Sequence, residues 1–246
     1  MFLKFLSYPR SFIMLPVFVL WTLLCCFIVI GITFVSDSMV VNDAIIGFWG
    51  RSSCRLFGVR VVVEGRENIP ATGFLYVFSH ASYFDIYAMA GWLGHIRFGA
   101  KIELFKIPFF GTAMTRLGML PISRGRREEV LKIYEKSEVR IRQGERFALA
   151  PEGTRQDSDT LGSFKSGPFV FAIRAKAPIV PVVIKGASEV LHKDAIVPNL
   201  GAWQRTIVIK ILPPVATDNL TIEQRPQLQE KVRLLMADYF PVEKAL

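Results

Sequence analysis

The sequence predicts an α/β fold: a mixed, largely parallel sheet flanked by helices, with an N-terminal membrane-embedded helical pair. From residue 59 onward, short apolar runs that end in polar or turn-forming residues alternate with amphipathic stretches, which indicates strands alternating with helices. Ahead of this region, residues 12–35 carry no charged side chain. A chain of 246 residues is long enough for one sizeable domain plus an appendage. We expect residues 1–57 to form membrane-anchoring helices and residues 58–246 to form the α/β domain.

The composition points to a membrane surface and an anionic partner. Hydrophobic residues make up 51% of the chain and the mean hydropathy is +0.35, which is high for a soluble protein. The formal net charge of +9 suits an anionic membrane and also an anionic substrate. A nucleic-acid partner is disfavoured, because the sequence has no zinc-ligand set, RNA-recognition signature or Lys/Arg-rich run. The three cysteines form no disulfide framework, which argues for a reducing compartment.

The apolar stretch at residues 12–35 has three interpretations. As a helix it is long enough to cross a bilayer, at ~1.5 Å per residue against ~30 Å of hydrocarbon. A cleaved signal peptide is disfavoured, because the stretch is too long and lacks an Ala-x-Ala-like site. A single span, with Lys4 and Arg10 on the cytoplasmic side, would export the rest of the chain. In the third interpretation a second helix, capped by Asn42 or Asp43 and running to about residue 57, returns the chain to the same side.

The first half of the α/β region predicts three strands and one helix. Residues 59–63 are rich in β-branched side chains and predict a strand at a sheet edge, and the apolar residues 74–78 predict a buried strand. Residues 83–92 predict a helix with Ser82 as its N-cap. Residues 96–100 predict a short strand that ends at Lys101.

The second half continues the alternation. Helices are expected at residues 127–142, 167–176 and 222–239, and strands at residues 146–150, 179–184 and 206–211. The first of these helices is amphipathic, with four side chains expected to face the core: Val130, Ile133, Tyr134 and Val139. The last is expected to turn four others inward: Leu228, Val232, Leu235 and Met236.

His80 and Asp85 are the candidate acid–base pair. His80 lies where the strand at residues 74–78 gives way to the helix at residues 83–92, and Asp85 lies in the first turn of that helix. Ligands bind beyond the carboxyl ends of strands in open α/β sheets. An imidazole can take a proton from a hydroxyl there, while a carboxylate holds its tautomer. The alternative is a hydrogen-bonded histidine beside an acid that only favours the helix dipole.

Other catalytic classes find less support. The two remaining histidines, His95 and His192, lack an acid at useful spacing, and no Gly-x-Ser-x-Gly nucleophile motif occurs. A mechanism without a covalent serine intermediate is therefore favoured. Neither metal-ligand spacing nor a dinucleotide-binding glycine motif is present, so we expect no metal and no cofactor.

Four further segments follow His80 in a fixed order, at residues 101–111, 118–124, 151–155 and 177–182. Together with the His-x4-Asp pattern, they resemble the glycerolipid acyltransferase family, most closely the bacterial 1-acylglycerol-3-phosphate acyltransferases. The resemblance covers roughly residues 59–190. It departs from the family at Ser79 and Ala81, where Asn and Gln are usual, and at Ala150, where Phe is usual.

The resemblance implies a function. A fatty acyl group would pass from acyl-CoA or acyl-carrier protein to the free hydroxyl of lysophosphatidic acid (1-acyl-sn-glycerol-3-phosphate), giving phosphatidic acid. His80 would be the general base and Asp85 would orient it. Substrate-binding residues would be Lys101, Arg124 and Arg155 on the phosphate, with Glu152, Gly153 and Thr154 in the same loop. Glu152 either holds this loop or assists acceptor binding, and residues 180–182 either shape an acyl pocket or form a plain core strand.

Two alternatives to this function stay open. The acceptor could be another lysolipid or glycerol-3-phosphate, or the chain could be a non-catalytic lipid-binding protein. The resemblance also implies an N-terminal helical pair. Because cytosolic acyl donors cannot reach an exported domain, we prefer the hairpin to the single span. This places the protein on the cytoplasmic face of the cell inner membrane.

Overall fold

The computed structural model describes residues 2–36, 39–123, 125–157 and 161–240. Its helices are α1 (Phe2–Val35), α2 (Met39–Leu56), α3 (Tyr83–Trp92), α4 (Phe110–Arg116), α5 (Arg127–Arg142), α6 (Gly167–Ala175), α7 (Ala187–Val190) and α8 (Arg225–Ala237). Its strands are β1 (Val59–Glu64), β2 (Phe74–Phe78), β3 (Ile96–Lys101), β4 (Leu120–Ile122), β5 (Arg146–Leu149), β6 (Ile179–Lys185) and β7 (Arg205–Ile211).

One seven-stranded sheet has the order β1-β7-β6-β2-β5-β3-β4. Every neighbouring pair is parallel except β6 and β7. The predicted fold class, a mixed and largely parallel sheet flanked by helices, is confirmed, and β1 lies at the edge as expected. The antiparallel pairing of β7 and the short elements α4 and β4 were not predicted.

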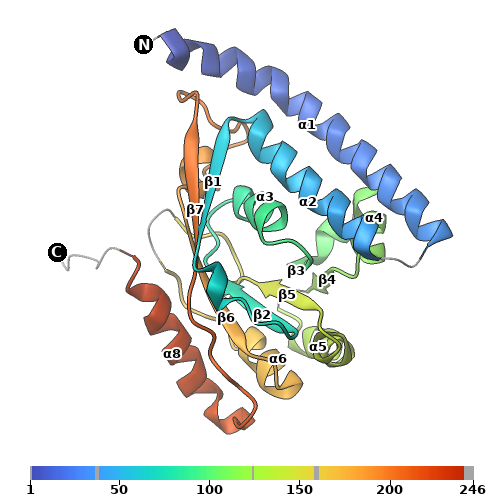
Figure 1. The fold of residues 1–246 in the computed structure, drawn as a ribbon, viewed down its shortest axis with the longest axis vertical. Helices are drawn as coiled ribbons and strands as arrows, with labels where there is room; N and C mark the ends of the chain where they lie inside the picture. Colours follow the sequence, from blue (N-terminus) through green and yellow to red (C-terminus); the bar gives the residue numbers. More distant parts are fainter. Residues whose placement is uncertain (1, 37–38, 124, 158–160, 241–246) are drawn as a thin grey trace.

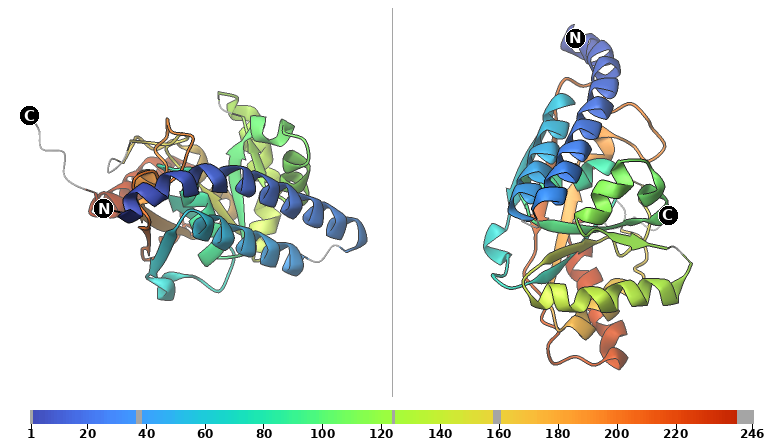
Figure 2. Two further views of the ribbon diagram at one scale, coloured as in Figure 1. Left: turned by 90° about the horizontal axis from the view of Figure 1, so that it is seen from above. Right: turned by 90° about the vertical axis from the view of Figure 1, so that its right-hand side faces the viewer.

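Both faces of the sheet are covered. Figures 1 and 2 show α1 and α2 side by side along one side of the molecule, with α5, α6 and α8 on the other. Strand β2 contributes side chains to the hydrophobic cores on both faces of the sheet, because successive side chains of a strand point to opposite faces. Phe74, Tyr76 and Phe78 pack toward α3, whereas Leu75 and Val77 pack toward α5 and α6. All five are buried, which explains why β2 appears in the sequence as an unbroken apolar run.

Helix α1 lies along the domain and is attached at both ends. Near its start, the Arg10 guanidinium donates to the carbonyl oxygens of Phe57 (3.2 Å), Ala202 (3.2 Å) and Trp203 (2.5 Å). Near its end, Arg116 of α4 lies 4.1 Å from the Phe34 ring centroid. The helix continues through its two prolines. Among the described residues, one helical segment, Phe5–Val35, is long and apolar enough to cross a membrane, with a mean hydropathy of 2.8.

Helices α2 and α3 approach each other at glycines. A Cβ atom on Gly50 would lie 2.5 Å from the Tyr87 carbonyl oxygen and 2.6 Å from the Gly91 nitrogen. Across this contact, Arg51 donates to the Gly91 carbonyl oxygen at 2.7 Å. The second N-terminal helix is therefore part of the folded domain, where it covers α3.

Three details of the predicted elements were wrong. Helix α2 begins at Met39, so Asn42 and Asp43 lie inside it and do not cap it. The buried Asp43 carboxylate instead pairs with Arg97 of β3 at 2.5 Å. In α5, Val139 is 53% exposed, because the helix turns Tyr134 and Ile141 into the core. The last predicted helix is divided into a 3₁₀ turn, Ile222–Gln224, and α8.

We predict that Gly50→Ala destabilises the protein by about 1–3 kcal/mol, the usual cost of overpacking. The added methyl group would collide with the backbone of α3, which cannot rotate away as a side chain can. The matched control is Gly31→Ala in α1, where no atom lies within 4 Å of the new Cβ. Thermal unfolding in detergent should show a lower Tm for the first variant only. An equal Tm for both variants would contradict the close crossing.

Candidate active site

The site is at the carboxyl ends of three adjacent parallel strands. Strands β2, β5 and β3 are neighbours in the sheet, and each is followed by a candidate site residue. His80 comes two residues after β2, Glu152 comes three after β5, and Lys101 ends β3. Parallel strands bring these carboxyl ends to one edge of the sheet, where α/β folds bind ligands.

The His80 and Asp85 side chains are in contact. His80 Nδ1 lies 2.9 Å from Asp85 Oδ2. The same oxygen accepts from the backbone N–H groups of Ala81 and Ser82, each at 2.8 Å. With Ser82 as N-cap, this is a capping box at the start of α3. Asp85 therefore starts the helix and also contacts the imidazole.

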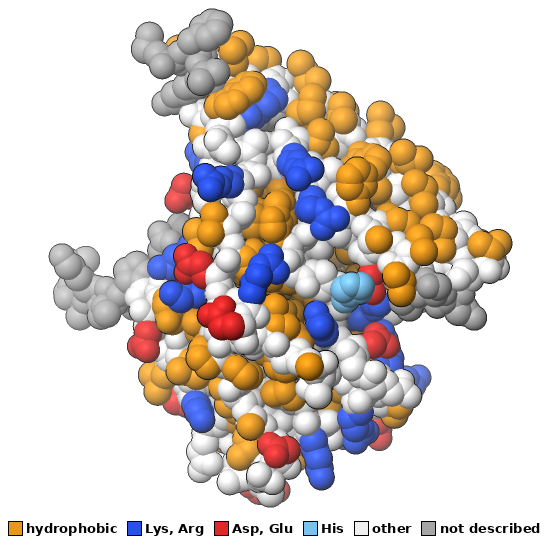
Figure 3. Space-filling view, viewed as in Figure 1, with side chains coloured by type: hydrophobic (Ala, Val, Ile, Leu, Met, Phe, Trp, Pro, Cys, Tyr) orange, Lys and Arg blue, Asp and Glu red, His pale blue; other side chains and the backbone are white. Residues whose placement is uncertain are grey.

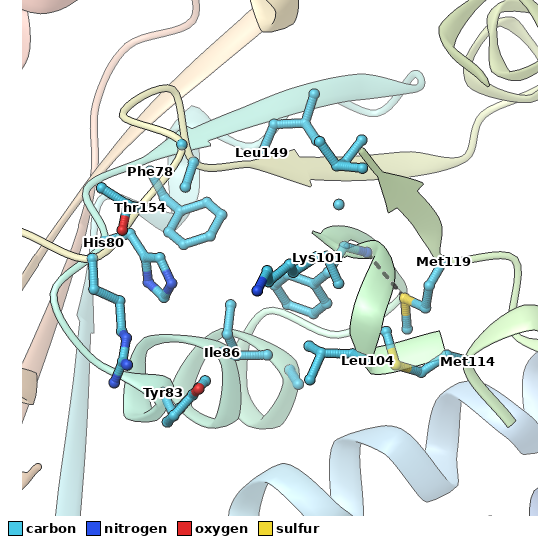
Figure 4. A pocket seen from close by; sticks show the side chains of 18 of the residues that line it. Phe78, His80, Tyr83, Ile86, Lys101, Leu104, Met114, Met119, Leu149 and Thr154 are labelled. Atoms are coloured by element: carbon cyan, nitrogen blue, oxygen red, sulfur yellow. Dashed lines mark hydrogen bonds between the residues drawn. The ribbon is translucent and has the colours of Figure 1, made fainter. Parts of the chain in front are cut away.

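The contact also fixes which ring nitrogen can act as a base. An ionised carboxylate only accepts hydrogen bonds, so Nδ1 carries the hydrogen and Nε2 is left to take a proton. The Asp85 side chain is buried, whereas that of His80 is 16% exposed and lines a cavity. In Figure 4 the imidazole lies beside the Phe78 ring, with which it makes an edge contact at 5.6 Å between centroids.

Glu152 connects the end of β2 to the loop that follows β5. Its Oε2 accepts from the His80 backbone N–H and its Oε1 accepts from the Gly162 N–H, each at 3.0 Å. Burial raises the pKa of the Glu152 carboxyl to about 7, opposed by these two hydrogen bonds and assisted by the Asp85 charge. This geometry supports the interpretation in which Glu152 holds the loop.

Two of the three predicted phosphate-binding residues, Arg155 and Lys101, lie at the cavity. The Arg155 guanidinium carbon lies 4.2 Å from the ring centroid of Tyr83, which is the first residue of α3. Lys101 Nζ lies 3.7 Å from Glu103, and Figure 4 shows the Lys101 side chain among those lining the cavity. Arg124 lies outside the described residues.

The remaining two residues of the loop, Gly153 and Thr154, also line the cavity. Gly153 has a φ of 74°, a conformation that favours glycine. Its backbone thus turns beside His80 without strain.

A cavity of about 1160 Å³ opens at His80 and reaches beneath the N-terminal helices. Its apolar lining includes Phe18 and Val29 of α1, Ile46 of α2, Ile86 of α3, Met114 of α4 and Met119. Polar groups border it at His80, Lys101, Glu152 and Arg155. A ligand with a polar head and a long hydrocarbon chain matches this distribution.

Residues 180–182 do not line the cavity. Val180 and Val182 are buried in the core on the α3 side of the sheet, and Pro181 is in the middle of β6. Of the two interpretations of this segment, the plain core strand is correct.

Sequence reasoning missed three contributors to the site. The Tyr83 ring lies beneath Arg155, the Ser79 hydroxyl accepts from the Ile184 N–H at 2.9 Å, and the Gln156 N–H donates to the His80 carbonyl oxygen at 2.8 Å. Only Ser79 left a signal, as a polar residue directly after a buried strand. Among the described residues, no group of three His, Cys, Asp or Glu side chains is placed to hold a metal ion.

The site is thus an oriented histidine beside a largely apolar cavity on an α/β sheet. The acyltransferase family model matches residues 60–185, just over half of the chain. The chain therefore belongs to the acyltransferase family.

Curated relatives agree with this assignment. A 1-acyl-sn-glycerol-3-phosphate acyltransferase of Saccharomyces cerevisiae is 32% identical over 74% of this chain and 60% of its own length. The alpha enzyme of that name from Ovis aries is 30% identical over 89% of this chain and 76% of its own. The chain spans less than two thirds of the length of several of these curated relatives, with 50% for an Arabidopsis thaliana chloroplast protein.

The fold matches that of the 1-acyl-sn-glycerophosphate acyltransferase of Thermotoga maritima. The TM-score is 0.76 at 22% identity, over 99% of both chains. At this level of identity the similarity speaks for the fold.

We predict that Glu152→Gln flattens the pH dependence of stability between about pH 5 and about pH 8. The raised pKa, about 7 against an ordinary 4.5, means that folding favours the protonated carboxyl. That contribution is complete below pH 4.5 and is lost as the pH rises through about 7. It amounts to a few kcal/mol at most, since one pKa unit corresponds to about 1.4 kcal/mol.

The measurement is Tm against pH for the wild type and two variants. Glu103→Gln is the control, because that side chain is 54% exposed. Wild type and control should lose stability with rising pH more steeply than Glu152→Gln. Parallel curves for all three would show that burial does not shift the titration of Glu152.

Proposed function

We propose that this protein transfers a fatty acyl group from a thioester donor to the free hydroxyl of lysophosphatidic acid, giving phosphatidic acid. The observation that carries the proposal is the His80–Asp85 contact of 2.9 Å at the mouth of an apolar cavity of about 1160 Å³. The yeast and sheep relatives are named for this activity. The donor is acyl-CoA or acyl-carrier protein, and the chemistry at the site is the same for both.

His80 acts as the general base. Its Nε2 takes the proton of the acceptor hydroxyl while that oxygen attacks the thioester carbonyl carbon. A C–O bond forms, the C–S bond breaks, and the proton passes from the imidazolium to the departing thiolate. Asp85 holds Nδ1–H and stabilises the imidazolium while it is charged. Acyl transfer is direct, with both substrates bound together.

The acceptor's phosphate binds beside this pair. Arg155 presents a planar guanidinium whose forked donors match phosphate oxygens, and the Tyr83 ring beneath it limits its motion. Lys101, on the cavity wall, supplies a second positive charge, and Arg124 a third. Glu152, Gly153 and Thr154 form the loop that presents Arg155.

The apolar part of the cavity receives hydrocarbon. Side chains from α1, α2, α3 and α4 line it, so that an acyl chain enters between the N-terminal helices and the sheet. A non-catalytic lipid-binding protein would need the cavity but not a base held by a buried carboxylate. Another lysolipid or glycerol-3-phosphate is the remaining alternative acceptor, which an assay over a panel of acceptors distinguishes.

We predict that His80→Ala and Asp85→Asn each lower turnover by roughly 10²–10⁴-fold, the usual contribution of a general base. The first removes the proton acceptor and the second removes the group that orients it. Asp218→Asn, at an exposed loop position, is the control for the second. The assay follows labelled donor with purified protein and lysophosphatidic acid, alongside the Tm of each variant. Near-normal turnover in a folded His80→Ala protein would reject the mechanism.

Residues 1–57 are proposed to attach the protein to the cytoplasmic face of the cell inner membrane, and residues 58–246 to form the catalytic domain. Contacts at both ends of α1 support an arrangement along the membrane surface, because a helix perpendicular to the domain would break the Arg10 bonds. The outer face of α1 is apolar, with Phe12, Leu20 and Phe34 at least 57% exposed. Figure 3 shows hydrophobic side chains gathered along this helix.

We predict that Leu20→Asp weakens binding to anionic liposomes by roughly 100-fold, since burying a carboxylate in hydrocarbon costs about 3 kcal/mol. Val139→Asp is the matched control: that valine is 53% exposed, against 68% for Leu20, but lies on α5. Liposome flotation measures both variants. A carboxyl-terminal tag should also resist external protease in intact cells. Digestion from outside would contradict the cytoplasmic placement.

A further inference from the structure

A further cation, Lys193, lies outside the residues assigned above, and its partner Asp157 belongs to the segment that follows Arg155. Lys193 Nζ is 2.8 Å from Asp157 Oδ1, and His192 Nε2 is 3.8 Å from the same oxygen. The hydrogen bond to Asp157 raises the pKa of the Lys193 amino group, and the charge of Arg155 acts in the opposite direction. Asp157, the partner of Lys193, is two residues after Arg155, so Lys193 contacts the segment that presents the guanidinium.

The segment that carries Lys193 is fixed to the start of α3. The Ser82 hydroxyl donates to the Leu191 carbonyl oxygen at 2.8 Å, and Ser82 is fully buried. Ser82 is also the residue whose N–H donates to Asp85. The Asn199 N–H donates to the Val190 carbonyl oxygen at 2.6 Å, which closes the loop behind Lys193. Lys193 is thus two residues after Leu191, and Leu191 is bonded to Ser82, which also donates to Asp85.

The partner of Lys193 is fixed from the other side. Asp157 follows Gln156, whose N–H donates to the His80 carbonyl oxygen at 2.8 Å. Asp157 also lines a small recess together with His80 and Ala81. The Lys193–Asp157 contact is therefore connected to the site through Asp157, which borders His80.

This ion pair can exchange its anion at little cost. The side chains of Lys193 and Asp157 are 31% and 64% exposed, and exposed pairs contribute little to stability. A phosphate monoester carries more charge than one carboxylate and offers three acceptor oxygens. A phosphate bound by Arg155 would lie near Lys193, because the partner of Lys193, Asp157, is two residues after Arg155.

We propose that Lys193 is a further binding residue for the phosphate monoester of the acceptor, and that the phosphate replaces Asp157 as its partner. Asp157 then acts as an internal competitor that sets the acceptor's affinity. The inference deepens the proposed function, on which it rests, and it names a residue after β6 as part of headgroup recognition.

The test uses two substitutions with opposite expected signs. Lys193→Ala should raise the KM for lysophosphatidic acid about tenfold with kcat changed less than about twofold, since a charge-assisted bond to the phosphate is lost. Asp157→Asn should lower that KM severalfold, because it removes the competitor. The double variant should behave as Lys193→Ala alone. Lys231→Ala, an exposed lysine on α8, is the control and should leave both constants unchanged.

A structural role for the pair predicts a different pattern. If breaking the contact only loosened the loop, both single variants would raise the KM, and that result would overturn the proposal. A change confined to the KM of the acyl donor would overturn it as well. Lys193→Arg, which keeps the charge, should recover most of the affinity.

A binding measurement separates this inference from the proposed function. Equilibrium dialysis with labelled lysophosphatidic acid, below its micellar concentration, is made on His80→Ala protein carrying each of the two substitutions. Opposite shifts in affinity without any turnover by the wild type would retain the headgroup site and reject the transferase. Turnover without these shifts would retain the transferase and reject the role of Lys193.

Discussion

One carboxylate oxygen organises the site. Asp85 Oδ2 receives the imidazole Nδ1–H of His80 and the backbone N–H groups of Ala81 and Ser82, all within 2.9 Å. These three donors come from consecutive residues, so that the turn between β2 and α3 wraps around a single buried charge. The charge is stabilised there because Oδ2 accepts three hydrogen bonds and the carboxylate lies in the first turn of a helix. The direction of the histidine is thereby set by the same bonds that begin α3.

The second carboxylate of the site, Glu152, has a different hydrogen-bonding arrangement and a raised pKa. Glu152 accepts two backbone N–H groups, one on each oxygen, and burial still raises its pKa to about 7. Asp85 contributes to the increase, since a nearby like charge disfavours ionisation. Two buried acids that both contact one histidine thus have distinct tasks. Asp85 orients the ring, and Glu152 joins the loop of Gly153, Thr154 and Arg155 to the strand that carries it.

The N-terminal helices are walls of the cavity, and the outer face of α1 is apolar and exposed. Phe18 and Val29 of α1 and Ile46 of α2 line the same space as His80. Because Arg10 and Arg116 hold α1 against the domain at both ends, a shift of this helix would change the shape of the cavity. The glycine crossing of Gly50 and Gly91 leaves α2 little freedom to move independently of α3. Access from the bilayer to the base is therefore coupled to how α1 and α2 pack.

Features that depend on neighbouring residues could be predicted from the amino-acid sequence. Helices Tyr83–Trp92 and Arg127–Arg142 begin and end as predicted, since periodicity and capping act within a few residues. The His80–Asp85 contact could also be predicted from the local sequence, because the two residues are five positions apart on one turn. Strand β2 was evident from its composition, since a strand buried on both faces must be apolar throughout.

Contacts between residues far apart in the chain became evident only from the folded arrangement. The bond from the His80 N–H to Glu152 spans 72 residues, and the Arg10 bond to Trp203 spans 193. The burial of Asp43 against Arg97, the stacking of Arg155 on Tyr83 and the pairing of Lys193 with Asp157 are of the same kind. Local patterns record which face of an element is apolar, but not which partner covers it or which way β7 runs beside β6. That choice is made when the elements pack and every buried polar group must find a partner.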